Sequence, residues 1–70
     1  MDTRYVQSFV TVVESGSLAE AARRLDLTPA AIAARVRTLE EELGATLIKR
    51  VGRSVKATEA GLKALERARA

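Results

Sequence analysis

The chain of 70 residues contains no cysteine, no histidine and no tryptophan, and only one proline. Without cysteine no disulfide can cross-link the fold, and without cysteine and histidine the common zinc sites, Ser-His triads and thiol nucleophiles are excluded. No apolar run approaches the ~18 residues of a membrane span, and the N-terminus lacks the unbroken apolar stretch of a signal peptide. These absences predict a soluble, cytoplasmic protein that binds a partner without catalysis, metal, cofactor or membrane contact.

Large apolar side chains are also scarce. Hydrophobic residues make up 47% of the chain, but many of them are alanine. A single small domain with such a limited core is marginally stable unless it is tightly packed or supported by association. We therefore expect one domain that works together with another molecule.

Charge is unevenly distributed along the chain, although the net charge is only +3. Residues 27–37 contain two arginines and no acid, and residues 49–58 contain four cations and no acid. Three glutamates and no base lie between them, in residues 38–48. Clustered cations attract polyanions such as DNA, because each neutralised phosphate releases counterions. The alternative is a solvated surface with mixed charge.

Two short helices are predicted in the first third of the chain. The first begins near Asp2 or Thr3, either of which can cap a helix, and it ends at Gly16. The second opens at Ser17 with a capping box, in which the Ser17 hydroxyl accepts from the backbone N–H of Glu20 while the Glu20 side chain reaches back.

A third, longer helix follows after about three connecting residues. Thr28 is its predicted N-cap, Pro29 occupies the first helical position, and Gly44 ends it. This spacing suits a helix-turn-helix, although an ordinary helical hairpin has similar connections. One face carries large apolar residues for the core, and the opposite face carries Ala30, Ala34, Arg37 and Glu41.

A β-hairpin and a last helix complete the predicted fold. Leu47–Arg50 and Val55–Ala57 form the strands, and Arg53 lies at the tip of the turn between them. Thr58 caps the last helix, in which Gly61 costs up to ~1 kcal/mol unless close packing requires it. A mainly α fold with a small β-hairpin in this order is a winged helix-turn-helix. We predict that residues 1–58 form this domain and that residues 59–70 begin a linker or dimerisation helix.

Three runs of the sequence carry a family resemblance. They are SLAEAARRLDLTPAAI from Ser17, LEEELGATLIKR from Leu39 and GRSVKATEAG from Gly52. Together they resemble the N-terminal DNA-binding domain of LysR-type transcriptional regulators, over nearly the whole chain and in matching order and spacing. The resemblance implies sequence-specific binding of double-stranded DNA, with helix 29–43 in the major groove and wing 50–56 at the minor groove or backbone.

The resemblance also implies partners. Members of the family are longer bacterial regulators, and a small-molecule effector binds a second domain that is absent from this chain. Their linker helix pairs with that of a second copy, so the chain is expected to form a homodimer on a roughly palindromic operator. The predicted dimerisation residues are Leu62, Leu65 and Ala68. Packing against the first helix is the other use open to these side chains.

The third helix departs from the family pattern. Thr28-Pro29-Ala30 stands where the family often has Ser-Gln-Pro, and Ala33 and Ala34 stand where it often has serine and arginine. A glutamine in the first turn could read adenine, whereas proline cannot. Alanine methyls can touch thymine methyls but discriminate little between bases. The groove face of this helix is therefore expected to be nearly bare.

Individual roles follow from position and chemistry. Thr28 and Ser17 lie at helix N-termini, where they can meet a phosphate or serve only as caps. Arg37 points outward and is a candidate for base or phosphate contact, whereas Arg35 lies nearer the core and has a salt bridge as its alternative. Arg53 is the candidate for insertion into a narrow minor groove.

Arg50 and Lys56 are expected to hold phosphates, and Lys49, Arg23 and Arg24 to be solvated. The full predicted DNA-contacting set is Ser17, Thr28, Pro29, Ala30, Ala33, Ala34, Arg35, Arg37, Arg50, Arg53 and Lys56.

Other functions remain open from the sequence. A winged helix can bind an acidic protein partner through a basic wing and never contact DNA. The DNA-binding domain of another winged-helix family is a second alternative. An enzyme would have to use Glu40 to Glu42, which lie on a helix surface with neither a visible pocket nor a metal-ligand partner.

Overall fold

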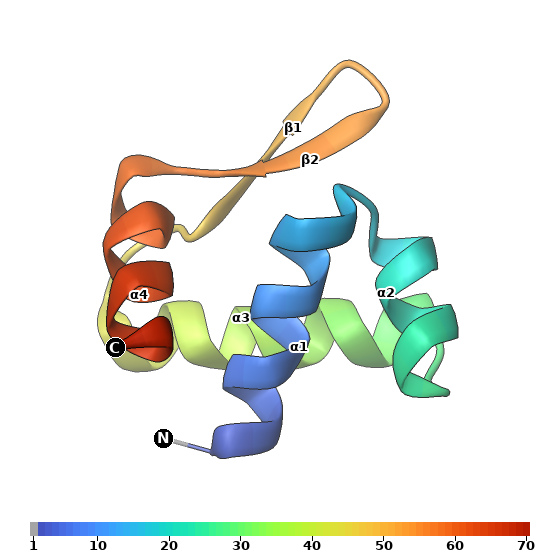
Figure 1. The fold of residues 1–70 in the computed structure, drawn as a ribbon, viewed down its shortest axis with the longest axis horizontal. Helices are drawn as coiled ribbons and strands as arrows, with labels where there is room; N and C mark the ends of the chain where they lie inside the picture. Colours follow the sequence, from blue (N-terminus) through green and yellow to red (C-terminus); the bar gives the residue numbers. More distant parts are fainter. Residues whose placement is uncertain (1) are drawn as a thin grey trace.

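The structure, a computed structural model, describes residues 2–70. Four helices and one hairpin follow the predicted order, and Figure 1 shows the hairpin projecting beyond the helices while α3 runs behind α1. This confirms the mainly α fold with a small β-hairpin. Within the described residues, no helix has the length and apolarity needed to cross a bilayer. The elements are α1 (Thr3–Ser15), α2 (Leu18–Leu25), α3 (Pro29–Leu43), β1 (Ile48–Val51), β2 (Ser54–Ala57) and α4 (Glu59–Arg69).

Each helix begins where the sequence places a capping side chain. The hydroxyl of Thr28 accepts from the backbone N–H of Ala31 at 3.1 Å, and the carboxylate of Asp2 accepts from that of Arg4 at 2.8 Å. The helix ends are also determined by neighbouring residues. The first helix, α1, ends at Gly16, whose φ of 72° lies in the left-handed region that glycine adopts freely. The predicted boundaries of the helix-turn-helix are thus confirmed, with residues 26–28 connecting α2 and α3.

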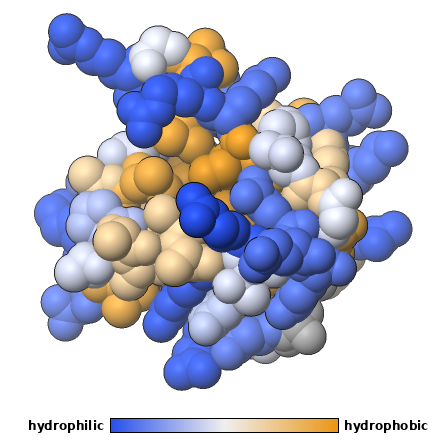
Figure 2. Space-filling view, turned by 180° about the vertical axis from the view of Figure 1, so that it is seen from behind, coloured by the Kyte–Doolittle hydropathy of each residue, from blue (hydrophilic) through white to orange (hydrophobic). Residues whose placement is uncertain are grey.

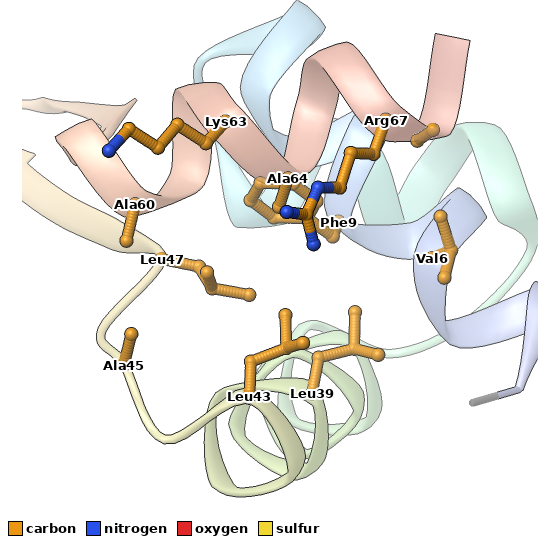
Figure 3. Close-up of a pocket in the computed structure, with 11 residues that line it drawn as sticks. Val6, Phe9, Leu39, Leu43, Ala45, Leu47, Ala60, Lys63, Ala64 and Arg67 are labelled. Carbon is orange, nitrogen blue, oxygen red and sulfur yellow. The ribbon is translucent and has the colours of Figure 1, made fainter. Parts of the chain in front are cut away.

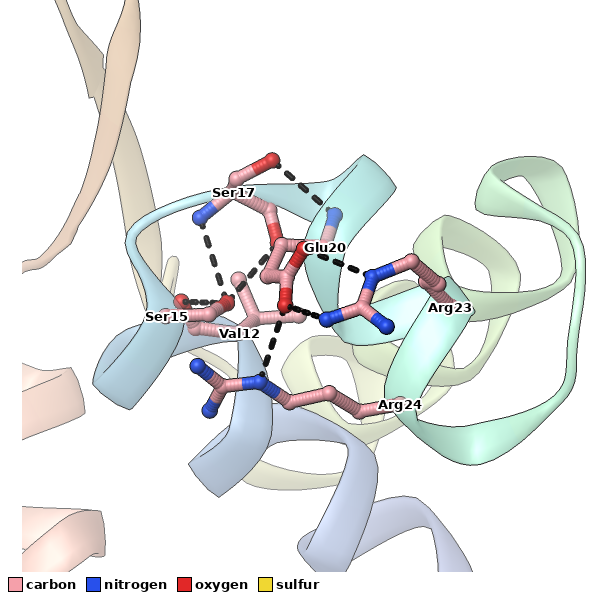
Figure 4. A network of polar contacts seen from close by, with 6 residues as sticks. All are labelled: Val12, Ser15, Ser17, Glu20, Arg23 and Arg24. Atoms are coloured by element: carbon pink, nitrogen blue, oxygen red, sulfur yellow. Dashed lines mark hydrogen bonds and ion pairs between the residues drawn. The ribbon is translucent and has the colours of Figure 1, made fainter.

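The predicted capping box at α2 is only half correct. The Ser17 hydroxyl accepts from the Glu20 N–H at 3.1 Å, as expected, but the Glu20 carboxylate binds Arg23 and Arg24 instead of reaching back (Figure 4). The Ser17 N–H donates to the Ser15 hydroxyl at 3.3 Å. Two charged donors outcompete one backbone amide for a carboxylate. Hydrogen bonds from Arg23 and Arg24 lower the pKa of Glu20 from its usual 4.5 to about 2.

One core joins all the helices and the hairpin. Alanines on α2 allow close helix packing, and α1 contributes the largest buried side chain, Phe9. Ser8 is fully buried among them, and its hydroxyl donates to the Arg4 carbonyl at 3.0 Å. The hydrophobic core consists of Phe9, Val12, Ala21, Ala22, Ile32, Val36, Leu39, Leu47, Val55 and Leu65.

The hairpin is short and is tied to the helices. Val51 pairs with Ser54, so Gly52 and Arg53 form a two-residue turn, and Gly52 has φ 61° as the first position of a type II′ turn requires. Midway along β2, the Val55 N–H donates to the Gly16 carbonyl at 2.9 Å. The wing therefore hydrogen-bonds to the turn between α1 and α2, and Arg53 lies at its tip as predicted.

An apolar pocket of about 380 Å³ remains between α1, α3 and α4. Figure 3 shows Leu39 and Leu43 of α3 facing Phe9 and Val6 of α1 across it, with the Arg67 side chain of α4 extending over the opening.

Candidate nucleic-acid interface

The exposed face of α3 carries small residues and one cation. Pro29, Ala30, Ala34 and Arg37 are exposed, and Ala33 is half-buried, while the opposite face of the helix packs into the core. Figure 2, which views the molecule from behind, shows weakly apolar residues below a projecting part in which hydrophilic residues predominate and some apolar atoms are exposed. The first turns of this face can approach another surface closely, and its long polar side chains are Arg37 and, one turn further on, Glu41.

The hydroxyls of Thr28 and Ser17 both cap helices. Thr28 is exposed at the start of α3, whereas Ser17 is half-buried in a hydrogen-bond network with Ser15. Each hydroxyl oxygen already accepts from a backbone N–H, and its own proton can still be donated. Phosphate contact by either residue stays a prediction, and the geometry accounts for both residues as caps.

Arg35 is turned away from this face. Its Nη1 lies 3.3 Å from the Ser8 hydroxyl, and its guanidinium carbon lies 5.3 Å from the centre of the Tyr5 ring. Both partners belong to α1, so the side chain joins α1 to α3. These contacts favour a role of Arg35 within the fold, since positions 35 and 37 are about 200° apart on a helix, and DNA contact by Arg35 stays a prediction.

The register of the hairpin divides its cations between two faces. Lys49 pairs with Lys56, and Arg50 pairs with Val55, whose side chain is buried. Since successive residues of a strand point to opposite faces, Arg50 and Lys56 do not share a face. Lys49, which the sequence assigned to solvent, shares the face of Lys56. A strand register counted from the two-residue turn would have shown this.

Ion pairing separates the cations into two groups. Arg4, Arg23, Arg24, Lys63 and Arg69 each lie within 4.0 Å of an acidic side chain. Within residues 2–70, no ion pair involves Arg37 or any of the four cations of the hairpin. The seven cations of residues 2–70 without an ion pair are two on α3, four on the hairpin, and Arg67 on α4.

The predicted dimerisation residues of α4 differ in their exposure. Leu62 is 55% exposed, and Ala68 is also exposed. Leu65 is only 7% exposed and belongs to the core, so its assignment to an exposed seam needs correction. The physical reason is that Leu65 lies about 60° round the helix from Leu62, which turns it towards the core.

The three glutamates at the end of α3 are not equivalent. Glu40 accepts from the Leu47 N–H at 2.8 Å, while Glu41 and Glu42 are exposed. In the part of the chain that the structure describes, no three acidic side chains converge on a metal position. Sequence reasoning treated these glutamates as one acidic patch and missed the separate contact of Glu40.

Comparison with known proteins places this geometry in context. A family model described as "Bacterial regulatory helix-turn-helix protein, lysR family" matches residues 3–62. An uncharacterized HTH-type transcriptional regulator in the ibpB-leuC intergenic region of Azotobacter vinelandii is 44% identical over 68 residues, which cover 97% of this chain and 47% of that protein. The HTH-type transcriptional regulator AlsR of Bacillus subtilis is 43% identical over 61 residues, covering 87% of this chain and 20% of AlsR. The chain thus spans less than half the length of these relatives.

Solved structures resemble the fold closely. The CbnR DBD in its complex with DNA superimposes with a TM-score of 0.92 at 38% identity, covering 99% of this chain and 79% of that one. The BenM DBD in complex with catB site 1 DNA gives a TM-score of 0.91 at 37% identity, covering 97% of this chain and 76% of that one.

Proposed function

Because the chain belongs to the lysR family of bacterial regulatory helix-turn-helix proteins, we propose that it binds double-stranded DNA in a sequence-specific manner. In this proposal α3 enters the major groove and the β1–β2 hairpin meets the minor groove or the backbone. The observation that carries it is that six of the seven unpaired cations lie on these two elements, while five cations are paired with acids. The similar CbnR and BenM DBDs were solved in complexes with DNA, which supports DNA binding.

Base reading by α3 rests on a few contacts. Arg37 can donate two hydrogen bonds to a guanine, and the exposed alanines fit the groove by shape and contact thymine methyls. Since these methyl contacts discriminate weakly, DNA shape at the wing contributes a larger share of the specificity. Arg53, at the tip of the hairpin, is the side chain that enters a narrow minor groove.

Lys49 and Lys56 support a phosphate contact by one face of the wing. Like charges directly opposite one another destabilise a strand pair, and a DNA backbone lying along this face would offset that repulsion. Arg50 lies on the other face of the hairpin. There it binds a phosphate of the same DNA strand or of the adjacent strand of the duplex.

In vitro selection from random duplexes tests the proposed function. We expect the selected duplexes to share a motif, with two inverted half-sites separated by about one helical turn or more. Weak binding without sequence preference would reject the proposal, and it would favour a winged helix that uses its basic surface against an acidic protein partner.

Arg53→Ala tests the role of the wing. If Arg53 lies in the minor groove, the substitution should weaken binding to the selected duplex and reduce the slope of log K against log salt by about one. Arg23→Ala is the matched control, because Arg23 is exposed but already bound to Glu20. Fluorescence anisotropy at several salt concentrations measures both variants. An unchanged slope for Arg53→Ala would exclude the contact.

Dimerisation through α4 is proposed together with DNA binding. Leu62 is the exposed apolar residue that supports it, while Ala68 is exposed about 120° round the helix from Leu62. Leu62→Glu should leave the chain folded, because position 62 is exposed in the monomer. It should shift the chain towards the monomer in sedimentation equilibrium, because the dimer would have to bury the introduced carboxylate in its interface. Lys63→Ala, about 100° round the same helix from Leu62, is the control. A wild-type chain that is monomeric at high concentration, or a Leu62→Glu dimer, would reject this interface.

The place of the chain in a larger regulator is part of the same proposal. Residues 1–58 would form the DNA-binding unit and residues 59–70 the start of a linker helix, in the cytoplasm of a bacterium. A small-molecule effector would act through a second domain, in keeping with the greater length of the related regulators.

A further inference from the structure

One backbone position connects α3, the hairpin and α4. The N–H of Leu47 donates to Oε2 of Glu40 on α3 at 2.8 Å, and its carbonyl accepts from the N–H of Thr58 at 3.0 Å. Its side chain is only 1% exposed and is part of the core. Leu47 is therefore held through its amide, its carbonyl and its side chain at once.

The start of α4 closes around the same position. The Thr58 hydroxyl donates to the Thr46 carbonyl and accepts from the Gly61 N–H. Gly61 lies so close that a Cβ there would stand 2.1 Å from the Leu47 carbonyl oxygen. We call Glu40, Leu47, Thr58 and Gly61 the Leu47 clamp.

Both ends of the hairpin leave from this clamp. β1 begins at Ile48, directly after Leu47, and β2 ends at Ala57, directly before Thr58. Two four-residue strands have little stability of their own, so their direction depends on what anchors them. Besides the clamp, the hydrogen bond from Val55 to Gly16 is a second anchor, midway along β2.

Glu40 is the polar side chain that couples this clamp to α3. Thr58 and Gly61 belong to the hairpin exit and α4, and Leu47 to the hairpin entrance. Glu41 and Glu42, which follow Glu40 in the sequence, are exposed. Among the described residues, no hydrogen bond or ion pair of Glu42 is found that a substitution would remove.

We infer that the Leu47 clamp sets the direction in which the β1–β2 hairpin stands relative to α3, and that Glu40 is a positioning residue for DNA binding. This inference rests on the proposed function, in which both elements contact one duplex. Glu40 contacts no DNA in this arrangement. It acts by holding the hairpin where the wing cations meet phosphates while α3 lies in the groove.

Three substitutions with the same charge change isolate the hydrogen bond. Glu40→Ala removes the acceptor, Glu40→Gln keeps an acceptor oxygen, and Glu42→Ala removes an equal charge nearby. We expect Glu40→Ala to bind the selected duplex about tenfold more weakly, with a salt slope lower by about one to three because wing phosphate contacts are lost. Glu40→Gln and Glu42→Ala should keep the wild-type slope.

A purely structural role of Glu40 would lower the melting temperature without changing the salt slope of the folded protein. Measurements are therefore made well below each melting temperature, and amide exchange of Val55 reports loosening of the hairpin without DNA. Faster Val55 exchange is expected in Glu40→Ala and not in Glu42→Ala. If Glu40→Ala does not fold, Glu40→Asp, which retracts the acceptor by one methylene, takes its place with a smaller effect in the same direction.

The outcomes separate this inference from the proposed function. A wild-type chain that selects no duplex rejects DNA binding, whatever the exchange data show. A wild-type chain that binds specifically, together with a folded Glu40→Ala or Glu40→Asp whose salt slope and Val55 exchange equal those of Glu42→Ala, overturns the role of Glu40.

Discussion

Replacing Gly61 with alanine is expected to destabilise the chain by about 1–3 kcal/mol, the usual cost of forcing an extra carbon into a packed region. Helix propensity alone predicts the opposite sign, because alanine is favoured over glycine inside a helix by up to ~1 kcal/mol. The structure predicts destabilisation, since the added Cβ would lie 2.1 Å from the backbone oxygen of Leu47 and 3.2 Å from the Cβ of Ala57. Backbone atoms cannot move aside as a flexible side chain can.

Urea unfolding at pH 7 measures this effect directly. Glu66→Ala on the exposed side of α4 is the control, and it is expected to change the free energy of unfolding by less than about 0.5 kcal/mol. Gly61→Ala with a free energy of unfolding equal to or above that of the wild type would show that α4 does not approach Leu47 this closely.

Replacing Phe9 with alanine is expected to cost about 3–5 kcal/mol. Phe9 is the single phenylalanine of the chain, is 1% exposed and is the largest fully buried side chain. Domains of this length have a total stability of about 4–10 kcal/mol, so the loss is a large part of the whole. We therefore expect Phe9→Ala to be substantially unfolded at 37 °C, as seen in the circular dichroism at 222 nm.

Leu43→Ala is the matched control for Phe9→Ala, because both residues line the pocket between α1, α3 and α4 but Leu43 is 41% exposed. A cost of about 1 kcal/mol or less is expected for Leu43→Ala. Equal losses for the two variants would contradict a core built on Phe9.

Local signals predicted the helices and the hairpin. Thr28 and Pro29 define the start of α3 within a single turn, and Gly16 ends α1, because caps and stops act between residues a few positions apart. The Gly52-Arg53 turn placed Arg53 at the tip for the same reason. The element order then indicated the winged helix.

The candidate site was predicted less completely, since it depends on residues distant in sequence. Helical phase puts Arg35 near the core edge, but only the position of α1 shows that it meets Ser8 and Tyr5. Leu65 was expected in a seam, and the packing of α4 on the body buries it. The face shared by Lys49 and Lys56 required the strand register.

The amino-acid sequence by itself determined the elements, their caps, the arrangement of charge and the family, because each is written in neighbouring residues or in a pattern of spacing. The tertiary structure alone decided which of three adjacent glutamates holds the hairpin, why Gly61 has no side chain, and which cations remain unpaired. These depend on distances between α3, the hairpin and α4, and such distances are set by packing of the whole core rather than by any local segment.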